Sequence, residues 1–134
     1  MANTIVHFEI PADDPEKLAA FYTGLFGWKI TKMGGMPGME DVDYWGVETV
    51  PADEQGRPTE QGVNGGLMKR MMPEQKITNY ISVSNVEEYT AKAVSLGATI
   101  IMPKMAVPHM GWFAQFVDPS GNVIAIWQED PAAA

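Results

Sequence analysis

Residues 6–28 read VHFEIPADDPEKLAAFYTGLFGW, and this stretch decides the fold of the first half of the chain. Its opening alternates between two kinds of side chain, with Phe8 and Ile10 on one side and His7 and Glu9 on the other. Strict alternation of this kind is typical of a half-buried strand. We therefore predict a strand over residues 4–11.

A helix follows this strand. Asp14 is a favourable N-cap, and Pro15 suits the first helical position because the N–H that proline lacks would have no partner there. Gly27 is typical of the residue that ends a helix. The helix is predicted to bury one apolar face, with residues at i, i+3, i+4 and i+7: Leu18, Phe21, Tyr22 and Leu25.

The same pattern recurs in the second half of the chain. A strand is predicted over residues 78–84, and Asn85 then caps a helix, with Glu88 three residues later as in a capping box. Gly97 ends this helix about 70 positions after Gly27 ends the first. Its predicted buried stripe consists of Val86, Tyr89, Ala93 and Leu96.

Three further strands are predicted after each helix. They cover residues 28–32, 44–50 and 65–70, and then 99–102, 112–117 and 123–128. Residues 33–39 and 51–64 read as loops, and the tail from 129 should be loose. An order of strand, helix and three strands that occurs twice indicates a duplication. We predict one α+β domain over 1–134, with half-repeats at about 4–71 and 77–129.

Composition excludes several classes of function. The chain has 134 residues, a net charge of −8 and no cysteine, so disulfides and thiolate chemistry are impossible. The acidic balance disfavours nucleic acid, and no apolar run is long enough to span a membrane. The N-terminus shows no secretory signal. We expect a cytoplasmic protein without nucleic acid or membrane partners.

Three stretches together resemble the vicinal oxygen chelate superfamily, which includes glyoxalases, bleomycin-resistance proteins and dioxygenases. They are residues 6–28, 86–98 and 116–127, the last reading FVDPSGNVIAIW. The resemblance implies two βαβββ modules whose curved sheets enclose a cleft. It also implies a divalent metal in that cleft, chelated by vicinal oxygens of the substrate, and a homodimer.

The metal ligands that the family would supply are mostly missing from this chain. His7 matches the family's first-strand histidine, but the equivalent position of the second half is Thr78. The family's chelating glutamate would fall at Ala125, and strand 65–70 offers neither carboxylate nor imidazole. A divalent metal generally needs three or more donors. We therefore expect no metal and no other cofactor, with a rescuing His7/Glu9/His109 site as the alternative.

Alternation within the strands predicts which side chains line the cleft. In the first half these are His7 and Glu9, which could act as an acid–base pair or could simply hydrogen-bond each other and hold the strand in register. In the second half the predicted ligand-binding residues are Thr78, Tyr80, Ser82, Phe113, Gln115, Ala125 and Trp127. Aromatic walls with a few polar groups are typical of small-molecule sites.

Three functions follow from these residues. The first is a metal-independent protein that binds a small, partly aromatic molecule in the cleft between the two modules. The second is a lyase, isomerase or dioxygenase of the superfamily type, with His7 and Glu9 as metal ligands or as general acid and base. The third is an accessory module that binds a partner through loops rich in its ten methionines.

Overall fold

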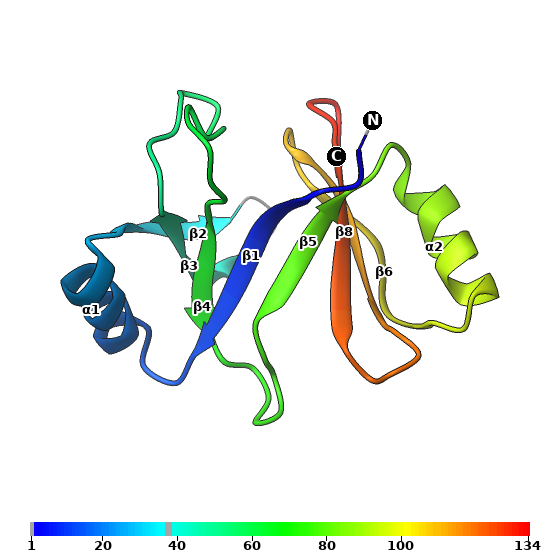
Figure 1. Ribbon diagram of the computed structural model, residues 1–134, viewed down its shortest axis with the longest axis horizontal. Coiled ribbons are helices and arrows are strands. Elements are labelled where there is room, and N and C mark those ends of the chain that lie inside the picture. Colours follow the sequence, from blue (N-terminus) through cyan, green and yellow to red (C-terminus); the bar gives the residue numbers. More distant parts are fainter. Residues whose placement is uncertain (1, 37–38) are drawn as a thin grey trace. The chain divides into compact units, whose positions relative to one another are not determined.

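The computed structural model describes residues 2–36 and 39–134 (Figure 1). The chain forms two compact units. We call Val6–Ile77 module 1, and Thr78–Ala134 together with residues 2–5 module 2. The N-terminal residues belong to module 2 because the amide of Ser82 donates to the carbonyl of Thr4.

Module 1 has one helix and four strands in the described ranges. In chain order they are β1 (Ile5–Ala12), α1 (Pro15–Phe26), β2 (Lys29–Met36), β3 (Met39–Glu48) and β4 (Gly65–Lys69). The strands lie in the order β2-β3-β4-β1. β1 pairs with β4 in parallel, and the β2–β3 and β3–β4 pairs are antiparallel.

Module 2 repeats this arrangement. Its elements are β5 (Thr78–Ser82), α2 (Val86–Ser95), β6 (Thr99–Val107), β7 (Gly111–Val117) and β8 (Val123–Glu129). The strand order is β5-β8-β7-β6, with β5 parallel to β8 and the other pairs antiparallel. The predicted α+β fold of two βαβββ modules is therefore confirmed.

The ends of α1 are set by local chemistry, as predicted. The side chain of Asp14 accepts a hydrogen bond from the amide of Lys17 at 3.2 Å. Gly27 follows the helix with φ of 72°, a left-handed conformation that costs glycine little.

The core of module 1 lies between α1 and one face of its sheet. Leu18 of the helix and Trp28 just after it pack against buried Trp45 and Leu67. The predicted apolar helix face is wrong in part, because Phe21 is 56% exposed and Leu25 is 59% exposed. Of the four predicted residues, Leu18 packs against the core cluster, and the ring of Tyr22 stacks on Trp28 at 5.1 Å.

The core of module 2 is built in the same way. Asn85 accepts from the amide of Glu88 at 2.9 Å, which confirms the predicted cap, and Val86 is fully buried. Val83, Ala114 and Ile126 complete this cluster under α2. Leu96 was predicted to be buried but is 70% exposed, because it lies past the last turn of the helix.

Three strands, β2, β3 and β6, are longer than predicted. The expected loop 33–39 is wrong, since β2 continues to Met36 and β3 begins at Met39; positions 37 and 38 lie outside the described residues. β6 was predicted to end at residue 102 but reaches 107. Its pairing with β7 continues through a register shift between Met102 and Met105, a position that tolerates the intervening Pro103.

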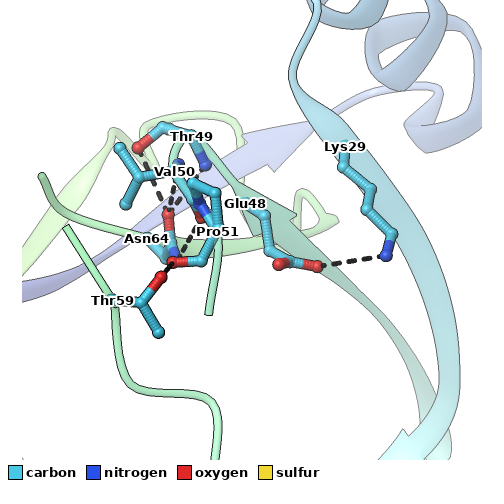
Figure 2. Close-up of polar contacts among 7 residues, drawn as sticks. All are labelled: Lys29, Glu48, Thr49, Val50, Pro51, Thr59 and Asn64. Carbon is cyan, nitrogen blue, oxygen red and sulfur yellow. Dashed lines mark hydrogen bonds and ion pairs between the residues drawn. The ribbon is translucent and has the colours of Figure 1, made fainter. Parts of the chain in front are cut away.

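Residues 51–64 form the predicted loop between β3 and β4, and one side chain closes it. The carboxamide oxygen of Asn64 accepts from the amides of Thr49 at 2.7 Å and Val50 at 3.0 Å, while its nitrogen donates to the Val50 carbonyl (Figure 2). Thr59 donates to the carbonyl of Pro51. These bonds fix the two ends of the loop against each other.

The C-terminal tail is ordered, contrary to the prediction that it is loose. The indole of Trp112 donates to Asp130 at 2.9 Å, and the amide of His109 donates to the carbonyl of Ala133. Ala133 is buried as a result. Neither helix in the described ranges is long and apolar enough to cross a membrane.

Candidate functional site

Each sheet has one face that packs against its helix and one face that does not. We call the second the helix-free face of the module. In module 1, Phe8, Trp45 and Leu67 belong to the helix side. Because neighbours along a strand point to opposite sides, His7, Glu9 and Tyr44 lie on the helix-free face. That His7 and Glu9 line a cleft stays a prediction from the sequence.

A chain of hydrogen bonds joins these three side chains. The Nε2 atom of His7 lies 2.9 Å from the hydroxyl of Tyr44, and that hydroxyl donates to Oε2 of Glu9 at 3.1 Å. His7 and Glu9 come from β1, whereas Tyr44 comes from β3. Strand β4 lies between these two strands, so the tyrosine side chain must cross it.

Gly66 provides the space for that crossing. It pairs with Glu9 of β1 and with Gly46 of β3. A Cβ atom placed on Gly66 would lie 1.7 Å from the hydroxyl oxygen of Tyr44 and 2.1 Å from its Cζ. No side chain fits there while Tyr44 holds this position.

His7 is neutral at physiological pH. Burial lowers the pKa of its imidazole from 6.5 to about 4, because the charged form loses its hydration. The single proton of Tyr44 is donated to Glu9, so the tyrosine oxygen must accept from His7. The imidazole proton therefore sits on Nε2.

Neither Tyr44 nor Gly66 was among the predicted site residues. The sequence nevertheless held a cue for each residue. Tyr44 lies directly before Trp45 on a strand whose side chains alternate between two faces. Gly65 and Gly66 are adjacent glycines within a strand, a pattern that indicates close approach of another group. What the sequence lacked was the β3–β4 register, which brings the two residues together.

All seven residues predicted for the second half lie in module 2. Two rows cross its sheet: Tyr80, Ala125 and Gln115 are partners in the first row, and Ser82, Trp127 and Phe113 in the second. Thr78 lies two residues before Tyr80, and therefore on the same face of β5, and its side chain is 7% exposed. These residues alternate with Val83, Ala114 and Ile126 of the core, so they lie on the helix-free face.

Aromatic rings and amide groups meet on this face of module 2. The carboxamide of Gln115 donates to the hydroxyl of Tyr80 at 3.2 Å. The rings of Tyr80 and Phe113 are tilted, with centroids 6.3 Å apart. Trp127 lies over Gly111, where a Cβ would approach its ring to 2.5 Å. The face thus offers rings whose orientation is set by their neighbours.

The two registers identify which positions of the modules are equivalent. His7 and Thr78 each lie seven residues before a helix cap, so Glu9 corresponds to Tyr80. Glu9 pairs with Gly66, and Tyr80 pairs with Ala125. Gly66 is therefore the module 1 counterpart of Ala125, the position at which the family resemblance implies a chelating glutamate.

The residues at these positions do not fit a divalent metal. Gly66 and Ala125 have no donor atom, and Thr78 has only a neutral hydroxyl. His7 is the one imidazole among the four, and it is bonded to Tyr44. Over residues 2–36 and 39–134, no three His, Asp or Glu side chains gather closely enough to hold a metal ion.

His109, the third member of the alternative metal site, belongs to module 2, whereas His7 and Glu9 belong to module 1. It occupies the turn between β6 and β7 with φ of 66°. Its backbone is held there by the bond to Ala133. Neither module by itself contains the His7/Glu9/His109 group.

A hollow of about 450 Å³ lies in module 1, but on the helix side. The ammonium group of Lys32 lies 5.4 Å from the ring centre of Trp45 there and 3.6 Å from Asp43. The hollow contains none of the predicted site residues. It is lined by Asp14, Pro15, Glu16, Lys32, Asp43, Trp45, Lys69 and Met71.

Comparison with known proteins assigns the class. The family model of the Glyoxalase/Bleomycin resistance protein/Dioxygenase superfamily matches residues 4–126. The chain belongs to this superfamily.

Among curated proteins, the chain is 30% identical over 126 residues to the anthracycline biosynthesis protein DauV of Streptomyces sp. (strain C5). The match covers 91% of this chain and 46% of DauV, so the chain spans about half the length of that relative.

Solved structures share the fold. A hypothetical protein from Bacillus halodurans gives a TM-score of 0.68 at 16% identity, covering 100% of this chain and 99% of that one. Methylmalonyl-CoA epimerase from Mycobacterium tuberculosis gives 0.66 at 11% identity, covering 95% and 88%. At these identities the likeness concerns the fold alone.

Proposed function

We propose that this protein binds a small, partly aromatic molecule on its helix-free faces without using a metal ion. The observation that carries the proposal is the place of the Tyr44 hydroxyl. It fills the space above Gly66, at the counterpart of a chelating position, and bonds to both His7 and Glu9. A hydrogen-bonding group thus stands where the family would place a metal ligand.

The composition of module 2 supports an aromatic ligand. Tyr80, Phe113 and Trp127 provide ring surfaces, and Gln115 provides an amide beside them. Sites of this make-up bind ring systems through stacking and a few directed polar contacts. DauV is named for anthracycline biosynthesis, and anthracyclines are fused aromatic rings that carry hydroxyl groups. A hydroxylated fused-ring compound is therefore the first probe to use.

The test is a titration of the protein with 2,6-dihydroxynaphthalene in the presence of EDTA, followed by calorimetry. We expect saturable binding that Trp127→Leu weakens about tenfold, in keeping with the loss of about 1.4 kcal/mol of ring contact. Phe21→Leu is the matched control, because Phe21 is an exposed aromatic residue on α1. It should bind like the wild type.

Elemental analysis completes this test. Protein exposed to Zn²⁺, Fe²⁺, Mn²⁺ and Ni²⁺ and then desalted should retain far less than one equivalent of metal. One retained equivalent that is lost in His7→Ala would contradict the proposal. Binding of the probe only when metal is added would contradict it as well.

The hydrogen-bonded chain favours a second candidate, an enzyme that uses acid–base chemistry. His7, Tyr44 and Glu9 can all carry a proton, and a positioned base typically accelerates proton transfer 10²- to 10⁴-fold. A suitable probe is 5-nitrobenzisoxazole. A base removes its ring C–H proton, the N–O bond breaks, and the oxygen keeps the electron pair as a coloured nitrophenolate.

For an enzyme, ring opening should exceed the rate in buffer and should fall about 10²-fold in His7→Ala. Circular dichroism must show that this variant is folded. His109→Asn is the matched control, because asparagine tolerates the positive φ of this turn. Equal rates in wild type and His7→Ala would exclude this candidate. Homodimerisation and an accessory role remain predictions from the sequence.

A further inference from the structure

We propose that Asn64 is a site of slow covalent modification, at which the side-chain carboxamide loses ammonia, and that the folded loop 51–64 protects this carboxamide through its hydrogen bonds. The chemical change is deamidation, with water as the co-reactant. The inference is independent of the proposed function, because none of the residues predicted to bind a ligand takes part in it.

The sequence makes Asn64 reactive. Asparagine is among the least durable side chains, and Asn64 is the one asparagine of the chain that is followed by glycine. Deamidation begins when the backbone nitrogen of the next residue attacks the carboxamide carbon, and a side chain on that residue hinders the approach. Gly65 has no side chain. The fold requires this glycine, because a Cβ atom there would lie 2.4 Å from the carbonyl oxygen of Phe8 and 2.6 Å from a carbon of its ring.

The reaction has two steps. In the first, the nitrogen of Gly65 bonds to Cγ of Asn64 and gives up its proton, the bond from Cγ to Nδ2 breaks, and Nδ2 takes up a proton and leaves as ammonia. In the second, water opens the resulting cyclic imide at either of its carbonyl carbons. The product is aspartate or isoaspartate, in which the main chain runs through the side-chain carboxyl carbon. One water is consumed and one ammonia is released, so the chain gains about one dalton.

The folded protein holds the carboxamide at both of its polar atoms. Oδ1 of Asn64 accepts from the amides of Thr49 at 2.7 Å and Val50 at 3.0 Å, and from the Thr49 hydroxyl at 3.2 Å (Figure 2). Nδ2 donates to the carbonyl of Val50 at 3.0 Å. Cγ lies between these two atoms and can reach bonding distance of the Gly65 nitrogen only if they move. Gly65 is itself buried and pairs with Val47 in the sheet. The imide can therefore form only after the base of the loop has opened.

The product does not fit the place that Asn64 occupies. Aspartate has an oxygen where asparagine has Nδ2, so the hydrogen bond to the Val50 carbonyl is lost and two acceptors meet there. Isoaspartate also lengthens the main chain directly before β4. Thr59 keeps its bonds to the carbonyl of Pro51, because Asn64 takes no part in them. The modification thus loosens the base of the loop and leaves its interior closed.

Mass spectrometry of peptides from protein kept at neutral pH and 37 °C measures the reaction. The mass gain should appear first in the peptide that contains Asn64, and it should be at least tenfold slower in the folded protein than in guanidinium chloride. Thr49→Val removes a hydroxyl that donates to Asn64 and to the Val63 carbonyl, and it should accelerate the reaction about threefold. Thr59→Val is the matched control, because it removes a hydroxyl of the same loop that donates to Pro51 instead. It should react like wild type.

Three outcomes would overturn the inference. Equal rates in the folded and the unfolded chain would show that the fold gives no protection. A Thr49→Val variant that reacts no faster than wild type would show that the hydrogen bonds are not its source. A mass gain that appears first at another asparagine of the unfolded chain would remove Asn64 as the reactive site.

A second measurement concerns the product. Asn64→Asp carries the aspartate from the start, and limited proteolysis with subtilisin should cleave this variant between residues 51 and 64 about threefold faster than wild type. Gln61→Glu is the matched control, since it adds the same charge to the loop at an exposed side chain. Cleavage of Asn64→Asp at the wild-type rate would overturn the loosening of the loop.

Discussion

Replacing Gly66 with alanine should destabilise the protein by about 3 kcal/mol, the upper end of the usual cost of overpacking. The new methyl group would meet the Tyr44 hydroxyl at 1.7 Å, and both neighbouring strands pair with Gly66, which leaves the backbone little room to move away. Urea denaturation followed by fluorescence measures the loss. The bonds from Tyr44 to His7 and Glu9 should break as well.

Two variants make this result specific. Gly24→Ala is the matched control, since nothing lies within 4 Å of a Cβ at Gly24 in the exposed part of α1. It should stabilise the protein by roughly 0.5–1 kcal/mol through helix propensity. In a Tyr44→Ala background, Gly66→Ala should cost little, because the clashing atoms are gone. A Gly66→Ala variant as stable as Gly24→Ala would show that Tyr44 does not cross β4.

Acid should destabilise the protein through His7. The pKa of His7 is about 4 in the folded protein, and 6.5 is the value for an unhindered imidazole, as in the unfolded chain. Above pH 6.5 both states hold a neutral imidazole, so the difference has no effect there. As the pH falls from 6.5 to 4, the unfolded state takes up the proton first, and folding loses about 3 kcal/mol.

Urea denaturation at pH 7, 6, 5 and 4 measures this dependence. Because carboxyl groups also take up protons at the acid end, the informative quantity is the difference between wild type and His7→Gln, whose side chain does not titrate. Wild type should lose about 3 kcal/mol more than His7→Gln over this range. Parallel curves for wild type and His7→Gln would contradict the burial of a neutral His7.

Local signals predicted the elements that local chemistry controls. The start of α1 depends on Asp14 and Pro15, which act within four residues, and its end depends on the left-handed Gly27. Alternation along β1 likewise placed His7 and Glu9 opposite Phe8, because the side chains of a strand point to opposite faces whatever the strand pairs with.

Strand length depended on distant partners. β6 passes Pro103 and reaches Val107 because β7 is there to pair with it. Nothing near residue 103 signals this, since proline in isolation argues against a strand. The tail was mispredicted for the same reason. Asp130 and Ala133 are held by Trp112 and His109, which lie 18 and 24 positions earlier in the chain.

The sequence by itself determined the family and the two-module fold, because both depend on which residues stand at fixed offsets from the helix caps. Only the tertiary structure revealed that the Tyr44 hydroxyl lies above Gly66 and bonds to His7 and Glu9. Tyr44 and Gly66 are 22 positions apart, and the β3–β4 register alone sets one over the other. Hydrogen bonds act over about 3 Å, so the group formed by His7, Tyr44 and Glu9 exists only after three strands have paired.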